Sequence, residues 1–387
     1  MVEVSFTSSC RSAWATDLTE AQMQVQSVEL RDFRSHHRFQ ADLGGSLTVI
    51  AGPNGSGKTN ILEGLHFGLT GRSCRTSMDR QVVAWDTDTT IASVSFSING
   101  VDHTLSTALQ RSGDKRVQLD GSAIETSVQI SDRPTVVVFL PDKLSLVNGA
   151  PGERRIHMDR VIGAFTPRMP SLKADYNQAL AQRNALLASS RSTGTRPQSL
   201  PAWDTKLAHA GTELVELRDR FIDEISSPVS EIAKELGLSG ELELSHRPAA
   251  SRDIDQYMTD LDARFETDKE RGFTSYGPHR GDFLFLRGSR EIKTTGSQGE
   301  KRTALLSLLL AERELIASRT GNVPLLLLDD VMSELDSQRR RLLTERVSRA
   351  GQCVITATEF AHVPTADLRD TELISLGSDS SHKLRVA

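Results

Sequence analysis

The amino-acid sequence predicts an α/β fold, in which a head with a β-rich lobe and a central parallel sheet is divided along the chain by an inserted, compact α-helical domain. Short apolar runs that are typical of buried parallel strands occur both before residue 52 and after residue 323. Apolar and polar residues alternate through much of the chain up to residue 150, and the period becomes helical after Pro151. We therefore divide the chain into a flexible N-terminal extension (1–22), the first part of the head (23–150), the inserted domain (151–271) and the second part of the head (272–387).

The composition is that of a globular protein without a basic excess. Hydrophobic residues make up 37% and charged residues 25% of the 387 residues, and the formal net charge is −5, so any contact with nucleic acid must use a local patch. Cys10, Cys74 and Cys353 are too far apart for a metal-binding pattern and predict no disulfide. No apolar run is long enough to cross a bilayer, and residues 1–22, which precede Met23, lack the apolar centre of a signal peptide. We expect an intracellular protein with no membrane partner.

The β-rich lobe and the first strand of the central sheet come first. Strands are predicted at 23–33, 36–43, 47–52 and 135–141. Two further hairpins are predicted at Asn99-Gly100 and Asp120-Gly121, because such pairs accept the positive φ angles of tight turns.

The inserted domain is predicted to contain a helical hairpin. Helices are expected over 171–190 and 203–225, each about 30 Å long at 1.5 Å per residue. One face of each helix is apolar: Leu172, Tyr176, Leu180 and Leu187 in the first, and Leu207, Leu214, Phe221 and Ile225 in the second. Helices of this length predict a compact domain and exclude a long coiled-coil rod.

A phosphate-binding loop follows the third strand. The pattern G-x-x-x-x-G-K-[ST] is matched by Gly52, Pro53, Asn54, Gly55, Ser56, Gly57, Lys58 and Thr59, and with Asn60 these are the predicted ATP-binding residues. Backbone N–H groups of such a loop point at phosphate oxygens, Lys58 adds a cation, and Thr59 offers a hydroxyl to Mg²⁺. The alternative, a chance match in a glycine-bearing turn, is disfavoured by the strand before it and the helix after it.

Two carboxylates follow a second apolar strand, "PLLLLDD". Asp329 and Asp330 stand where the carboxyl ends of parallel strands bind ligands. We expect Asp329 to hold Mg²⁺ together with Thr59, and Asp330 to orient or deprotonate the attacking water, with Lys58 as the third catalytic residue. Acidic residues at this point are also common turn and helix-cap formers, which remains the alternative.

The segment Ser297, Gln298, Gly299 and Glu300, here called the serine–glycine segment, begins a leucine-rich helix. Its pattern [ST]-x-x-[DE] fits a simple capping box. However, a serine–glycine helix start upstream of a strand ending in "DD" is also typical of ABC-type ATPases, in which it meets the γ-phosphate held by the other subunit. This reading predicts a symmetric homodimer with shared sites. Glu334, Leu335 and Asp336 would form the D-loop of that interface.

Several blocks of the chain together resemble the RecF family of recombination mediators, relatives of the SMC-type ATPases. The blocks are "LRDFRS" (30–35), "AGPNGSGKTNILEGL" (51–65), "GRSCRT" (71–76), "FLPDKLSLVNGAPGERR" (139–155), "QRNALL" (182–187), "GPHRGD" (277–282), "SQGEKR" (297–302) and "LLLLDDVMSELD" (325–336). The resemblance implies an ABC-type P-loop ATPase head with weak, DNA-stimulated activity. It also implies an ATP-dependent homodimer on gapped or junction DNA, RecO- and RecR-like partners that help to load RecA, and a cytoplasmic, nucleoid-associated location.

The chain departs from the family pattern at a few positions. Glu300 and Lys301 stand where family members usually carry two glutamines, and Gly281 replaces a usual aspartate. No histidine directly follows "QCVIT" as a γ-phosphate switch. Asp330 is one methylene shorter than the glutamate of many ABC ATPases, which predicts slow turnover.

Candidate DNA contacts are basic residues that could neutralise phosphates without reading sequence. They are Arg154, Arg155, Lys301, Arg302, Arg339, Arg340 and Arg341. Charge runs on helices are often only solvated faces, which is the alternative for each cluster. Aromatic content of 5% argues against a base-stacking single-strand binder.

Four rival functions fit parts of the sequence. A transporter ATPase subunit would carry its serine–glycine segment much sooner after the phosphate loop. A nuclease of the overcoming-lysogenisation type would need a further domain after Thr358, and an SMC-like cohesion ATPase would need hundreds of heptad residues in place of the insertion. The strongest alternative is a structural DNA clamp that binds ATP without significant hydrolysis.

Overall fold

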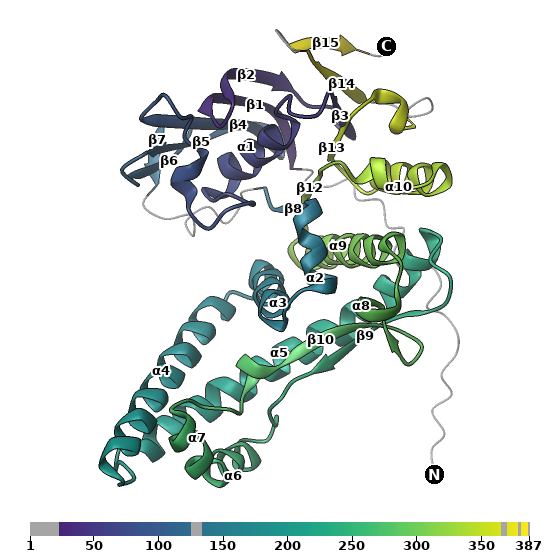
Figure 1. Ribbon diagram of the computed structural model, residues 1–387. Coiled ribbons are helices and arrows are strands. Elements are labelled where there is room, and N and C mark those ends of the chain that lie inside the picture. Colours follow the sequence, from purple (N-terminus) through teal and green to yellow (C-terminus); the bar gives the residue numbers. More distant parts are fainter. Residues whose placement is uncertain (1–22, 125–133, 365–369, 378–380, 386–387) are drawn as a thin grey trace.

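The computed structural model describes residues 23–124, 134–364, 370–377 and 381–385, so the predicted extension at 1–22 lies outside the described residues. Figure 1 shows a β-rich lobe and a second sheet in the upper part of the molecule and the long helices α4 and α5 in the lower part, with α9 between them. Among these residues, no helix is both long enough and apolar enough to span a membrane.

The β-rich lobe is an antiparallel sheet with strand order β2-β1-β4-β5-β6-β7. Its strands are β1 (Gln24–Phe33), β2 (His36–Asp42), β4 (Thr89–Ile98), β5 (Val101–Gln110), β6 (Lys115–Leu119) and β7 (Ser122–Ile124). Both predicted tight turns are present, with φ of 53° and 78° at Asn99 and Gly100 and of 51° and 78° at Asp120 and Gly121. Alternating buried side chains of this sheet pack against α1 (Lys58–Thr70).

The central sheet joins strands from both ends of the chain in the order β15-β14-β3-β13-β12-β8. They are β3 (Leu47–Ala51), β8 (Val136–Phe139), β12 (Leu325–Leu328), β13 (Cys353–Ala357), β14 (Thr371–Leu376) and β15 (Ser381–Arg385), of which only β15 is antiparallel. Every residue of β3, β12 and β13 is buried, as the apolar runs predicted. Ile50 faces the core under the β-rich lobe, whereas Val49 faces the core shared with α9 (Gln298–Thr320).

Helix α9 packs against both the central sheet and the inserted helices. Its buried face contacts β8 and α5, and all of its residues from Thr303 to Arg313 are buried. Near its end, the buried guanidinium of Arg313 donates to the carbonyls of Pro324 (2.8 Å) and Gln352 (2.9 Å), which precede β12 and β13. Gln352 in turn bonds both backbone groups of Val25 in the β-rich lobe, so the two sheets are directly joined.

The inserted helices are α3 (Pro151–Phe165), α4 (Met169–Thr193), α5 (Leu200–Glu235), α6 (Ile254–Ala263) and α7 (Phe265–Arg271). The predicted hairpin corresponds to α4 and α5, but the expected end of the second helix at Ile225 is wrong. Helix α5 continues through Pro228 for 36 residues, about 54 Å, because Val229, Ile232 and Ala233 beyond the proline are buried in the core.

A three-stranded sheet that the sequence reading did not predict lies beside α5. It consists of β9 (Leu242–Arg247), β10 (Asp282–Arg287) and β11 (Arg290–Glu291), and α8 (Ile292–Thr295) follows it. Strand β9 comes from the inserted domain and pairs with β10, which lies beyond residue 272. Residues before and after the predicted boundary at 272 therefore form a single sheet.

The other helices of the described residues are α2 (Ser145–Asn148), α10 (Ser337–Arg349) and the 3₁₀ turns Asp79–Val82, Pro141–Leu144, Pro278–Arg280, Val331–Glu334 and Phe360–His362.

Candidate functional site

The phosphate loop connects the end of β3 to the first turn of α1. Gly55 and Gly57 have φ of 83° and 91°, a region that disfavours residues with a Cβ. A Cβ on Gly57 would also lie 2.4 Å from Nε2 of His36, and His36 forms a 3.0 Å hydrogen bond with the Gly57 carbonyl. Lys58 Nζ donates to the carbonyls of Gly52 (2.7 Å) and Pro53 (2.9 Å), across the mouth of the loop. The ammonium group of Lys58 thus bridges the loop from its C-terminal to its N-terminal side.

The carboxylates at the end of β12 meet this loop. Thr59 Oγ1 lies 3.0 and 2.9 Å from the two carboxylate oxygens of Asp329, and Thr356 Oγ1 at the end of β13 donates to the same carboxylate at 2.7 Å. Burial raises the pKa of Asp329 above its usual value, while the two hydroxyl groups act in the opposite direction. The carboxyl ends of β3, β12 and β13 therefore form one polar site, as expected for a parallel sheet.

Asp330 is held in an unusual conformation at this site. Its φ is 47°, in the left-handed region, and its backbone N–H donates to Thr356 Oγ1 at 2.9 Å. Its Oδ1 and the Oγ of Ser56 are buried and have no hydrogen-bond partner among the described residues. A buried polar atom without a partner destabilises a fold by about 1–3 kcal/mol. Two such atoms beside a phosphate loop fit a site that takes a polar ligand.

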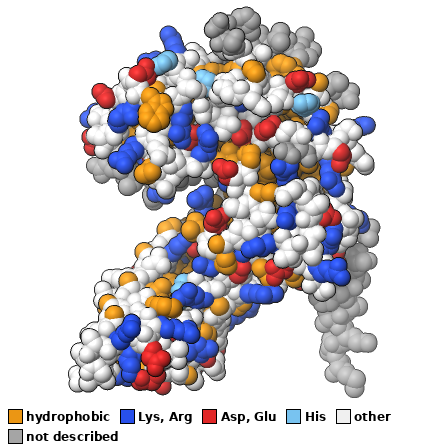
Figure 2. All heavy atoms as spheres, in the orientation of Figure 1, with side chains coloured by type: hydrophobic (Ala, Val, Ile, Leu, Met, Phe, Trp, Pro, Cys, Tyr) orange, Lys and Arg blue, Asp and Glu red, His pale blue; other side chains and the backbone are white. Residues whose placement is uncertain are grey.

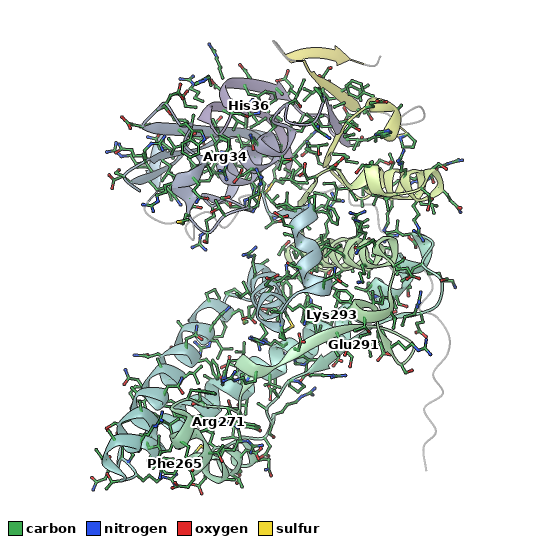
Figure 3. The ribbon with its side chains drawn as sticks, in the orientation of Figure 1. Arg34, His36, Phe265, Arg271, Glu291 and Lys293 are labelled. Atoms are coloured by element: carbon green, nitrogen blue, oxygen red, sulfur yellow. The ribbon has the colours of Figure 1, made fainter. Side chains whose placement is uncertain are left out.

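A buried carboxylate beside the loop was not predicted. Glu63 in α1 has no solvent exposure and accepts from Arg34 (2.9 and 2.8 Å) and from Ser73 Oγ (2.5 Å). Figure 3 labels Arg34 and His36 on the β-rich lobe. The blocks "LRDFRS" and "GRSCRT" thus meet on one side of α1. Both blocks stood out in the sequence, but nothing in their spacing indicated that they share Glu63.

The serine–glycine segment forms the capping box. Ser297 Oγ accepts from the Glu300 N–H at 3.3 Å, and the Glu300 carboxylate accepts from the Ser297 N–H at 2.7 Å. Glu300 also pairs with Arg287 of β10, which gives this departure from the family pattern a partner within the chain. Ser297 and Gln298 are exposed, and Figure 1 shows α8, which leads into α9, in the lower part of the molecule, away from α1. One chain therefore does not bring this segment to its own phosphate loop.

The predicted D-loop residues follow the carboxylates. Leu335 is buried in the core, and Asp336 caps α10 by accepting from the Arg339 N–H at 2.9 Å. The side chain of Glu334 lies outside the described part of the structure. These contacts explain why Leu335 and Asp336 are suited to the fold of a single chain. The role of the D-loop at a dimer interface stays a prediction.

The structure removes Arg154 from the candidate DNA contacts. Its side chain is buried and forms two bonds to the carboxylate of Asp282 (2.7 and 2.9 Å), and its third nitrogen donates to the carbonyls of Leu146 and Gly149. The place of Arg154 in a basic stretch of the sequence did not indicate its ion pair with Asp282. Arg154 instead joins "GAPGERR" to "GPHRGD", two blocks that lie far apart in the sequence.

The other candidates remain at least partly exposed. Arg155, Arg339 and Arg340 donate to the carbonyls of Gly281, Gly237 and Met332, respectively. Lys301 and Arg302 are half-buried in the first turns of α9, and Arg341 is exposed beside Glu345 on α10. Figure 2 shows blue and red side chains interspersed over the visible face, without a single broad basic surface.

Arg154→Ala is expected to lower the free energy of unfolding by about 3 kcal/mol, because it leaves the Asp282 carboxylate largely buried without its partner. Urea denaturation measures this difference. Arg341→Ala, which removes an exposed i,i+4 pair, is the control and should change the same quantity by less than about 0.5 kcal/mol. Unchanged stability together with weakened DNA binding in Arg154→Ala would return this residue to the DNA surface.

Comparison with known proteins gives the family. Residues 24–371 match the model of the RecF/RecN/SMC N terminal domain. The DNA replication and repair protein RecF of Chlorobium phaeobacteroides (strain BS1) is 32% identical over 347 residues, which cover 87% of this chain and 96% of that protein. The chain belongs to the RecF family. The RecF protein of Herpetosiphon aurantiacus is 34% identical over 362 residues, covering 87% of this chain and 94% of its own length.

Solved structures agree with the ABC/SMC-type head fold of a RecF chain. The recombination mediator protein RecF-ATP of the RecFOR pathway superposes with a TM-score of 0.82 at 25% identity, over 94% of this chain and 98% of that chain. An SMC head domain from Pyrococcus furiosus gives a TM-score of 0.57 at 16% identity, over 94% and 96% of the two chains, which supports the fold alone. The predicted family and fold class are confirmed.

Proposed function

We propose that this chain is an ABC-type ATPase that binds ATP and Mg²⁺ at the phosphate loop, dimerises in response and acts on DNA in recombinational repair. The observation that carries the proposal is the contact of Thr59 with Asp329 at 2.9 Å, which unites the two halves of a nucleotide site from opposite ends of the chain. The unpartnered Oγ of Ser56 and Oδ1 of Asp330 beside that contact support a ligand in the same place.

Each residue of the site has a specific role in this proposal. The loop N–H groups and Lys58 bind the β- and γ-phosphates, since Lys58 needs only to leave the carbonyls of Gly52 and Pro53. Thr59 and Asp329 would hold Mg²⁺, which when bound neutralises charge on the phosphates. Asp330 orients a water or accepts its proton. Thr356 holds the Asp329 carboxylate and the backbone N–H of Asp330 in place.

The position of the serine–glycine segment supports a homodimer. Its first two residues are exposed at the N-terminus of a 23-residue helix, which has the positive end of the helix dipole and free N–H groups. A symmetric dimer would place Ser297 of one chain on the γ-phosphate held by the other. The capping box does not compete with this role, because Gln298 and Gly299 keep their own N–H groups available at the same end.

The biological setting is proposed from the relatives. They are DNA replication and repair proteins, and the RecF-ATP structure is described as a recombination mediator of the RecFOR pathway. We infer that this chain binds gapped or junction DNA as a dimer and assists RecA loading with RecO- and RecR-like partners, in the cytoplasm at the nucleoid. Arg155, Lys301, Arg302, Arg339 and Arg340 are the proposed contacts to DNA phosphates, which would be independent of sequence.

Asp330→Asn tests both dimerisation and hydrolysis. We expect the variant to form the ATP-dependent dimer as wild type does, because the neutral amide keeps the shape and the phosphate loop is intact. Its turnover of ATP should fall about 100-fold, because an amide cannot accept the proton of the attacking water. Light scattering with ATP and gapped DNA measures the dimer, and phosphate release measures turnover.

Asp102→Asn is a matched control, since Asp102 is an exposed residue of β5 whose side chain accepts a hydrogen bond from Gln26. It should leave both measurements unchanged. Wild type that dimerises with ATP but shows no hydrolysis would favour the structural clamp, in which both carboxylates serve Mg²⁺ alone. Turnover by isolated monomers, independent of protein concentration, would contradict the dimeric site.

A further inference from the structure

Trp85 is an aromatic side chain that stands in solvent next to the nucleotide site. It is 95% exposed, whereas no other described large apolar side chain is more than 57% exposed. Its backbone is nevertheless fixed on both sides. The Ala84 N–H donates to the Asp32 carbonyl of β1, and Arg111, which directly follows β5, donates to the carbonyls of Ala84 and Thr87. The indole is thus presented from a rigid position, which reduces the entropy lost when a ligand packs on it.

The indole lines a hollow of about 640 Å³, a volume in the range of small-molecule sites. Its other lining residues include Arg34, Ser35, Asn60, Arg80 and Arg111. The guanidinium of Arg80 makes no ion pair or hydrogen bond with the described residues, while Arg34 is held by Glu63. An aromatic face beside guanidinium groups is suited to a planar base attached to phosphate.

The hollow begins at the phosphate loop. Asn60 is in the first turn of α1, two residues after Lys58, and its Nδ2 donates to Ser35 Oγ at 2.8 Å. Ser35 in turn lies against the loop, since a Cβ on Gly57 would be 3.0 Å from its Oγ. A triphosphate on the N-terminus of α1 therefore has a nucleoside-sized space directly beside it.

We propose that the base of the nucleotide whose triphosphate is held by the phosphate loop stacks on the indole of Trp85. This inference rests on the proposed function and names the part of the chain that recognises the nucleoside. A DNA strand is a less suitable occupant, because Trp85 is the only aromatic side chain among the described residues that line the hollow and a strand would need successive stacking partners.

Trp85→Ala should weaken the binding of ATP about tenfold, the range for loss of one base–aromatic stack. Its affinity for ribose 5-triphosphate, which has no base, should equal that of wild type. Trp85→Phe should bind ATP nearly as wild type does, because it keeps an aromatic face. Met78→Ala, which removes another exposed apolar side chain of the same connection outside the hollow, is the matched control and should not change either affinity. Isothermal titration calorimetry measures all four proteins.

Fluorescence tests the contact directly. Replacement of Trp14 and Trp203 by phenylalanine leaves Trp85 as the single tryptophan. Its emission should be quenched by ATP and not by inorganic tripolyphosphate. If ATP binds in a Lys58-dependent manner but leaves Trp85 emission and the affinity of Trp85→Ala unchanged, the stacking proposal fails and the proposed function stands. Quenching by a short DNA oligonucleotide but not by ATP would also overturn it. Absence of any Lys58-dependent ATP binding would instead contradict the proposed function.

Discussion

Lys58→Ala is expected to weaken the binding of ATP on the order of 100- to 1,000-fold. The ammonium group lies at the mouth of the phosphate loop, 2.7 and 2.9 Å from the carbonyls of Gly52 and Pro53, so its removal takes away the only side-chain cation held inside that loop in the described structure. Each charge-assisted hydrogen bond contributes about 1.5–3 kcal/mol, and two to the phosphates account for this loss. Isothermal titration calorimetry with ATP and Mg²⁺ measures the affinity.

Lys115→Ala is the matched control for this change. Lys115 Nζ also donates to a backbone carbonyl next to α1, that of Gly71, but at the C-terminal end of the helix, where it also pairs with Asp79. Its loss should leave the ATP affinity within about twofold of wild type. Equal affinity of Lys58→Ala and wild type would mean that the glycine pattern is only a turn and that ATP does not bind here.

Ser297→Asp is expected to abolish the ATP-dependent dimer while leaving the chain folded. Aspartate caps helices as well as serine does, so the free energy of unfolding should stay within about 1 kcal/mol of wild type. In the proposed dimer, however, the new carboxylate would face the γ-phosphate of the other chain, and two anions at that distance repel strongly. Light scattering with ATP measures the dimer, and urea denaturation measures stability.

The N-cap of another helix provides the control for Ser297. Asp253 caps α6 by accepting from the Gln256 N–H at 2.8 Å, and Asp253→Ser exchanges the same two cap residues in the opposite direction. This variant should dimerise with ATP as wild type does. If Ser297→Asp also dimerises normally, the serine–glycine segment does nothing beyond starting α9, and the trans-site proposal is wrong.

The central sheet and the polar site at its edge could be predicted because their signals are local. The segments "LTVIAG", "PLLLLDD" and "QCVIT" each contain a short, mostly apolar run. Strands of this kind are buried in parallel sheets, whose carboxyl ends lie on one edge. Thr59 and Asp329 are 270 residues apart, yet the two patterns alone predicted that they lie in one site. The same local reasoning identified the capping box of Ser297 and Glu300.

The parts that could not be predicted depend on partners distant in the sequence. Glu63 looks like an ordinary polar position in a helix until Arg34 and Ser73 surround it. Strand β9 is six residues long and is stabilised by β10 and α5 together. The second predicted helix ended at Ile225, three residues before Pro228, but burial of the residues beyond the proline outweighs the single lost hydrogen bond.

Helix α9 has a mechanical consequence for the molecule. The helix packs against the central sheet and against α5, and Arg313 in its C-terminal half bonds the carbonyls of Pro324 and Gln352, which precede β12 and β13. Ser297 and Gln298 at its start are exposed. A packed helix of this kind resists bending and moves as a stiff rod. A tilt of the long helices would therefore be transmitted along the axis of α9 to the N-terminal end that carries Ser297, without any change in secondary structure.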